Sequence, residues 1–253
     1  MLSASRDRLV AYLDEYLALD EWEEKSLNGL QVEGAPEVEW VALATDAALA
    51  TFAMAEEAGA EFVIVHHGLF WGRPLPVVGA HRARIAALLD AGISLYAAHL
   101  PLDAHPEVGN NAVLARLLGI GKVEPFGVWG ERAIGWRGEL SSATDRAGLA
   151  GELEALLGAR PDVLAFGPDE IRSVAIVSGA AADLVADAAA AGVDAFVTGE
   201  TSHVTWHHAR ELEMNVFFAG HYATETLGVR ALGDHLAERF DLETVFLDAP
   251  TGY

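Results

Sequence analysis

The sequence predicts an α/β fold made of two similar α/β lobes that are related by an internal repeat. Three observations support this prediction: short apolar runs of strand type recur along the chain, Ala- and Leu-rich stretches separate them, and the order of these segments occurs twice. Strands that alternate with helices of about ten or more residues are typical of layered α/β folds. The expected strands lie at residues 38–46, 60–67, 93–100, 172–179, 194–200, 215–221 and 244–248.

The remaining segments follow from the same patterns. An amphipathic helix is expected over the first 25 residues, which lack the basic start and cleavage site of a secretory signal. Further helices are expected at residues 48–60, 81–92, 109–119, 144–158, 182–192 and 225–240. Residues 121–172, with an expected strand at AIGWRGEL, the helix at 144–158 and an expected strand at DVLAFG, would form a crossover between the lobes. We expect a single domain over 1–253, with approximate lobes 1–120 plus the C-terminal end and 121–253, and no inserted domain.

The two halves align, and the alignment pairs polar residues. VALATDAALATFAMAEEAGAEFVIVHHG parallels VAIVSGAAADLVADAAAAGVDAFVTGET, which pairs His67 with Glu200. ARIAALLDAGISLYAAHLPLD parallels HHARELEMNVFFAGHYATE, and each half then carries His-x-x-x-carboxylate after an apolar strand. A structural repeat needs only the apolar periodicity, so recurrence of ligand-type residues indicates a site. We expect it in the cleft between the lobes.

Composition excludes several classes of protein. The formal charge is −22, and only Lys25 and Lys122 are lysines. Such a field repels nucleic acid and counts against a nucleic-acid partner. It is also typical of adaptation to molar salt, with an acidic protein from a GC-rich genome as the alternative. No apolar run is long enough to span a bilayer, and there is no cysteine. We expect a soluble cytoplasmic protein whose metal ligands, if any, are His, Asp and Glu.

The stretch VIVHHGLFWG ends an apolar strand on two adjacent histidines. In a regular strand His66 and His67 point to opposite faces, so the pair is either solvent-exposed in a loop or each ring serves its own metal ion. Glycine next to a ligand allows close approach of the backbone.

His221 and Glu225 end one strand and begin the next helix, where α/β folds build sites and the helix dipole favours a carboxylate. The alternative is a capping glutamate beside an incidental histidine. Asp103 is expected in a loop as a metal ligand rather than a turn residue. His99 is a ligand, a hydrogen-bond partner of a ligand or a proton shuttle.

Together these side chains suffice for two divalent ions if one carboxylate bridges, and zinc, iron, cobalt, nickel or manganese all accept such ligands. This arrangement activates water in two-metal hydrolysis. Other histidines carry less weight. His203 and His208 are minor candidates for lining the pocket, and Glu200 is a candidate for holding an imidazole.

The sequence resembles the Nif-three-like family, also described as GTP cyclohydrolase 1 type 2 homologues or dinuclear metal centre hexameric proteins, in its short form. SLNGLQVEG, VIVHHGLFWG, AAHLPLDAHPEVGNNAVLARLLG, VTGETSHVTWHHA and AGHYATETLGVRAL carry the resemblance. It implies two divalent metal ions per subunit and a toroidal homohexamer built as a trimer of dimers. The metal ligands it implies are His66, His67, Asp103, His221 and Glu225, with Glu225 as the bridge and His99 in an acid/base role.

The resemblance implies a dinuclear metal-dependent hydrolase that acts on GTP or another small phosphorylated or cyclic substrate through metal-activated water. One alternative is a non-enzymatic metal-binding scaffold or regulatory protein. A further alternative is a ring that processes nucleic acid, against which the acidic surface counts.

Overall fold

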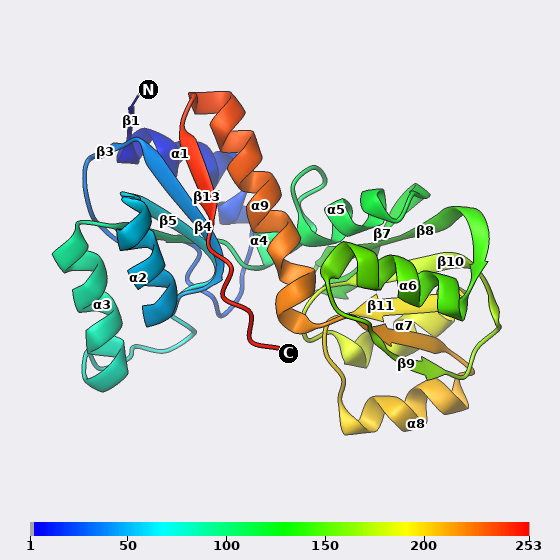
Figure 1. Cartoon of the computed structure of the whole chain (residues 1–253). Helices are drawn as coiled ribbons and strands as arrows, with labels where there is room; N and C mark the ends of the chain where they lie inside the picture. Colours follow the sequence, from blue (N-terminus) through cyan, green and yellow to red (C-terminus); the bar gives the residue numbers. More distant parts are fainter. Residues whose placement is uncertain (1–2, 253) are drawn as a thin grey trace. The chain divides into compact units, whose positions relative to one another are not determined.

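The computed structural model describes residues 3–252 and divides the chain into two compact units. Unit 1 comprises the chain up to Val108 together with Gly228–Ala249, and unit 2 comprises Gly109–Leu227 with the chain end from Pro250. Each unit has its own main β-sheet with helices packed on it (Figure 1). The predicted α/β fold class is therefore confirmed.

Unit 1 is built on a five-stranded sheet in the order β13-β4-β5-β6-β2, in which only β2 is antiparallel to its neighbour. Its strands are β2 (Gly29–Val32), β4 (Trp40–Asp46), β5 (Phe62–His67), β6 (Ser94–Ala97) and β13 (Glu243–Phe246). A small second sheet pairs β1 (Ala4–Ser5) with β3 (Glu37–Val38). The helices are α1 (Arg6–Tyr16), a 3₁₀ turn η1 (Leu19–Glu21), α2 (Leu49–Ala58), α3 (Gly79–Ala91) and α4 (Leu100–Ala104).

Both faces of this sheet are covered, because alternate strand residues point to opposite sides. One face, with Val41, Leu43 and Ile64, packs against α1 and the later turns of α9 (His221–Phe240). The other face, with Ala42 and Val63, packs against α2 and α3. This double burial explains why the strands are continuous apolar runs rather than alternating ones.

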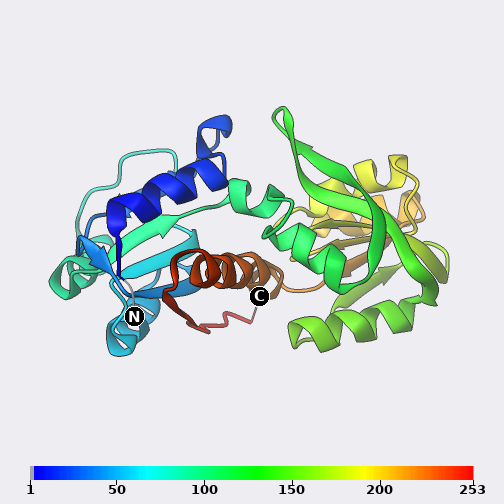
Figure 2. The same cartoon turned by 90° about the horizontal axis from the view of Figure 1, so that it is seen from above.

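Unit 2 is built on a six-stranded sheet in the order β7-β8-β10-β11-β12-β9. Its strands are β7 (Ile120–Trp129), β8 (Arg132–Asp145), β9 (Asp162–Ala165), β10 (Glu170–Val177), β11 (Ala195–Thr198) and β12 (Asn215–Phe218). The helices are α5 (Asn110–Leu117), α6 (Arg146–Leu157), a 3₁₀ turn η2 (Ala182–Leu184), α7 (Val185–Ala190) and α8 (His203–Glu211), and α9 begins in this unit. Seen from above, β7 and β8 form a long curved hairpin (Figure 2).

The repeat is visible in the strand order. In unit 1, β4, β5 and β6 run parallel and antiparallel β2 lies beside β6. In unit 2, β10, β11 and β12 run parallel and antiparallel β9 lies beside β12. Both units therefore bring the carboxyl ends of three parallel strands to one edge, where α/β sheets build their sites.

Three expectations about elements were wrong. The first helix is shorter than expected, because the chain leaves α1 at Leu17 and Ala18 adopts a left-handed conformation with φ 50°. The segment 121–172 contains the expected strands, as β8 and β9, but it is no simple crossover, since both of them, together with β7, pair into the sheet of unit 2. Asp103 lies in the short helix α4 rather than in a loop.

The edge strand β7 is irregular. Its pairing with β8 shifts register between Gly121 and Glu124, and Lys122 has a left-handed φ of 50°. Pro125, further along the same strand, has no N–H group to donate.

No helix between residues 3 and 252 combines the length and the apolarity that a membrane crossing needs.

Candidate metal centre

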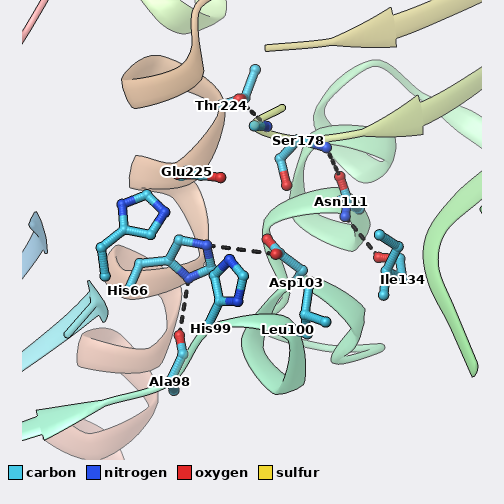
Figure 3. Close-up of polar contacts among 12 residues, drawn as sticks. His66, Ala98, His99, Leu100, Asp103, Asn111, Ile134, Ser178, Thr224 and Glu225 are labelled. Atoms are coloured by element: carbon cyan, nitrogen blue, oxygen red, sulfur yellow. Dashed lines mark hydrogen bonds and ion pairs between the residues drawn. The ribbon is translucent and has the colours of Figure 1, made fainter. Parts of the chain in front are cut away.

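His66 is the penultimate residue of β5, the central strand of unit 1, and is completely buried. Its Nδ1 lies 2.9 Å from the carbonyl oxygen of Ala98, which follows the neighbouring strand β6 (Figure 3). Because a carbonyl only accepts hydrogen bonds, Nδ1 carries the proton and Nε2 keeps its lone pair. The buried imidazole thus directs a ligand nitrogen away from the sheet.

Asp103 lies on α4 and is 5 % exposed. Its Oδ2 is 3.5 Å from Nε2 of His66 (Figure 3). Two ligand atoms that each lie about 2.1 Å from one tetrahedral ion are about 3.4 Å apart. The separation and the donor types therefore fit two ligands of the same metal ion.

His67 is held from the neighbouring strand. Its Nδ1 lies 2.9 Å from Oδ1 of Asp46, the last residue of β4 and its register partner in the sheet. A carboxylate on Nδ1 fixes the ring and leaves Nε2 as a ligand atom, an arrangement common among metal-binding histidines. Asp46 was not among the residues predicted from the sequence. Its position at the end of a buried strand, in the strand before HHG, was the signal that could have indicated it.

His99 precedes α4 and is held by the segment before β2. Its Nδ1 is 2.5 Å from Oε2 of Glu24, and its backbone N–H donates to Oδ1 of Asn28 over 2.9 Å. No sequence pattern indicated the role of Glu24, and Asn28 entered only as part of the motif SLNGLQVEG.

The three imidazoles of unit 1 form one cluster. His66, His67 and His99 each offer a ring nitrogen, and these atoms all lie within 4.8 Å of one another. The centroid of the His66 ring is 4.8 Å from that of His67 and 5.0 Å from that of His99. In each ring the Nδ1 atom is engaged by an acceptor. Such a cluster can hold a metal ion that prefers nitrogen ligands.

Gly68 lies close to side chains of two neighbouring strands. A Cβ at this position would lie 2.3 Å from Nε2 of Gln31 and 2.7 Å from Cβ of Ala97. The Gln31 side chain in turn accepts a hydrogen bond from the backbone N–H of Leu69 over 2.7 Å. Glycine follows the two histidines because the Gln31 amide packs against the backbone there.

In unit 2, His221 and Glu225 lie one turn apart at the start of α9. Nε2 of His221 is 3.0 Å from Oε2 of Glu225, and its Nδ1 is 3.5 Å from Oε1 of Glu200. In the metal-free chain the hydrogen bond to Glu225 raises the pKa of His221 to about 9, although partial burial opposes the shift. A proton and a metal ion therefore compete for this nitrogen. The placement of Glu200 agrees with the expectation that it holds an imidazole.

The loop after β10 forms a cradle for Glu225. Gly179 has φ 64°, and a Cβ there would lie 2.1 Å from Oε1 of Glu225 and 3.3 Å from Nε2 of His221. Thr224 accepts a hydrogen bond from the Gly179 N–H over 3.1 Å, and Asn111 accepts one from the Ser178 N–H over 2.7 Å (Figure 3). Only glycine leaves room for this carboxylate, which is 3 % exposed.

The structure brings the predicted residues together in two sets. Unit 1 contains His66, His67, His99 and Asp103, and unit 2 contains His221, Glu225 and Glu200. His203 and His208 are exposed on α8. The neighbouring His207 packs against Trp206, with ring centroids 5.0 Å apart. Sequence patterns thus identified most of the polar residues at the strand ends, and missed Asp46, Glu24 and Gly179.

Fold and side chains define an α/β protein with histidine and carboxylate clusters that could hold a metal ion. The chain belongs to the family Duf34/NIF3 (NGG1p interacting factor 3), whose model matches residues 4–252. This confirms the family predicted from the sequence motifs.

Relatives and solved structures agree with this assignment. The chain is 44 % identical over 247 residues to a protein of Deinococcus radiodurans named GTP cyclohydrolase 1 type 2 homolog, and the match covers 98 % of this chain and 94 % of the relative. A Halobacterium salinarum protein of the same name is 46 % identical over 243 residues, or 94 % of this chain and 96 % of the relative. The crystal structure of TTHA1606 from Thermus thermophilus superimposes with a TM-score of 0.93 at 47 % identity, covering 99 % of this chain and 100 % of that one.

Proposed function

We propose that the protein is a dinuclear metal-dependent hydrolase that acts on a nucleotide or another small phosphorylated or cyclic substrate. The observation that carries the proposal is the grouping of the unit 1 imidazoles, each with its Nδ1 on an acceptor, which places the lone pair on Nε2, the atom that binds a metal ion. The names of the relatives support GTP as the first substrate to test.

The proposed ligands are His66, His67, Asp103, His221 and Glu225, with Glu225 bridging two divalent ions. Zinc, iron, manganese, nickel and cobalt all accept imidazole and carboxylate ligands. Bound divalent ions supply Lewis acidity that activates water and stabilises negative charge on the reacting group.

The side chains of the protein have separate tasks in this proposal. Asp46 and the carbonyl of Ala98 fix the rings of His67 and His66, so that these ligands need little reorganisation. Gly179 keeps the place of the Glu225 carboxylate open. His99 transfers a proton to or from the substrate as the general acid or base.

Elemental analysis of the purified protein, followed by assay of the same sample for GTP turnover, tests the proposal. It predicts close to two ions per chain together with turnover. Two ions without turnover on GTP or other nucleotides would favour a non-enzymatic metal-binding scaffold or regulatory protein. Failure to bind metal, even after reconstitution, would refute the site itself.

The assembly and setting belong to the same proposal. We propose a cytoplasmic toroidal homohexamer, built as a trimer of dimers and adapted to high salt. The charge of −22 supports the salt adaptation. Light scattering in molar salt should give six times the chain mass, and a monomer or dimer mass there would contradict the hexamer.

A further inference from the structure

Glu24 is a buried carboxylate in the segment between η1 and β2, and its side chain is only 4 % exposed. Both of its oxygens are occupied. Oε2 is 2.5 Å from Nδ1 of His99, while Oε1 accepts hydrogen bonds from the Asn28 side-chain amide over 2.7 Å and from the Leu100 N–H over 3.1 Å. A buried carboxylate with this set of donors is satisfied as an anion.

These contacts determine which nitrogen of His99 carries the proton. Because an ionised carboxylate only accepts, Nδ1 of His99 must be the donor, and Nε2 keeps the lone pair. Asn28 links the same group to the backbone, since it donates to Glu24 and accepts from the His99 N–H. Glu24 therefore sets the tautomer of His99, and Asn28 helps to set the position of its ring.

The ring is also held from the side. The rings of Trp71 and His99 pack in a T-shaped arrangement, with centroids 5.0 Å apart and an interplanar angle of 77°. Trp71 is itself fixed by a hydrogen bond of 2.9 Å from its Nε1 to the carbonyl of Gly68. The contact with Trp71 and the hydrogen bond at Nδ1 together restrict the direction of Nε2.

The environment of Glu24 differs from those of the other two holding groups in unit 1. His66 is held by a neutral carbonyl, and His67 is held by Asp46, whose side chain is 37 % exposed. The Glu24 carboxylate that accepts from His99 is buried, so water weakens this hydrogen bond less than it weakens the one between Asp46 and His67. Of the three imidazoles, His99 therefore has the most strongly imposed tautomer.

We propose that Glu24 is a positioning residue that fixes His99 with its Nε2 lone pair toward the substrate, as a proton acceptor. In the reaction the proton leaves a water or substrate O–H group and binds to Nε2, while Glu24 stays ionised. The catalytic part of this inference rests on the proposed hydrolase. The tautomer assignment rests only on the contacts of Glu24.

The test is the ¹⁵N NMR spectrum of the histidine rings in the zinc-loaded protein, with the His99 signals assigned as those that the variant H99Q lacks. Wild type should show His99 protonated on Nδ1. In E24Q the amide oxygen must still accept from Leu100 and Asn28, so the NH₂ group faces His99 and the proton should move to Nε2. With GTP as substrate, kcat should fall about 100-fold with unchanged zinc content, as for loss of a general base.

The matched control is Asp14→Asn, which also removes one carboxylate charge from unit 1. Asp14 accepts a hydrogen bond from the Tyr96 hydroxyl over 2.9 Å. The His99 tautomer and kcat should stay as in wild type.

The outcomes separate the two proposals. An Nε2 proton on wild-type His99, or an unchanged tautomer in E24Q, would overturn the role of Glu24, and the wild-type spectrum decides even if E24Q does not fold. A moved proton with wild-type kcat would overturn its part in the reaction. If wild type shows the expected tautomer but never turns over substrate, the hydrolase fails and the assignment of Glu24 as the group that fixes His99 stands.

Discussion

Units 1 and 2 share a framework of three parallel strands and an antiparallel neighbour, yet they prepare their polar residues in different ways. In unit 1, acceptors occupy Nδ1 of each imidazole, so the cluster presents nitrogen lone pairs. In unit 2, one imidazole lies between the carboxylates Glu200 and Glu225, so the cluster presents negative charge. A repeated fold can thus supply different ligand chemistry at corresponding strand ends.

The largest expected effect concerns the cluster of unit 2, in which His221 lies between Glu200 and Glu225. Glu225→Ala should remove at least one of the two proposed ions, because a bridging carboxylate serves both. Elemental analysis after dialysis measures this loss. Full occupancy of both ions in the variant would refute the bridge and would make the two units less different than proposed.

The next effect separates His99 from the other imidazoles of unit 1. His99→Ala should leave the metal content unchanged and reduce any turnover by about 10²–10⁴-fold, the range expected for general acid–base catalysis. Elemental analysis and steady-state kinetics on one sample check both parts. Loss of metal would instead identify His99 as a ligand.

A smaller effect is expected from the group that holds His67. Asp46→Ala should weaken metal binding by about 10–100-fold, because the ring loses its orientation and the nitrogen loses basicity. Competition with a chelator measures the affinity. Asp90→Ala, which removes an exposed carboxylate on α3, is the control and should bind as wild type does.

The glycine cradle of unit 2 allows a matched pair of substitutions. Gly179→Ala and Gly59→Ala both place a side chain at positive φ, with a cost of about 1–2 kcal/mol each. A Cβ at Gly59 meets nothing within 4 Å, whereas one at Gly179 meets Glu225. Denaturant unfolding should show a loss of stability in both variants, the larger one in Gly179→Ala because the buried Glu225 carboxylate must also shift, and only Gly179→Ala should weaken metal binding. Equal metal affinities would argue against the cradle.

The smallest effect concerns the whole surface. At about 0.1 M salt the Debye length is about 10 Å, against about 3 Å at 1 M, so repulsion within the acidic chain grows. The melting temperature should fall as salt is lowered, by about 2–4 °C for each kcal/mol lost. Calorimetry across a salt series measures it, and a constant melting temperature would contradict salt adaptation.

The parts predicted well from the sequence are those that depend on local pattern. The buried run that ends at His67 is a strand because both of its faces are covered, and the repeat is visible because its apolar periods recur. Asp103 was assigned to a loop because a segment that contains Pro106 separates it from the next expected helix. The structure instead forms the short helix α4 before that segment, with Pro101 in its first turn, where proline is tolerated.

The groups that hold the imidazoles could not be found in this way. Glu24 is 75 residues from His99, and Asp46 is 21 residues from His67. Each is one of 38 acidic residues in the chain. Glu24 lies in an acidic stretch that gives no local signal, and the only signal for Asp46 was its position at the end of a buried strand. Only the sheet register and the packing of the segment before β2 select them.

The irregular edge of unit 2 has a consequence for self-association. A long edge strand is a template on which another chain can extend the sheet, and such growth leads to aggregation. In β7 the bulge at Lys122 and the missing N–H of Pro125 interrupt the row of backbone groups that an added strand would need. A second copy that met β7 would therefore not find one continuous row of backbone groups along the whole strand.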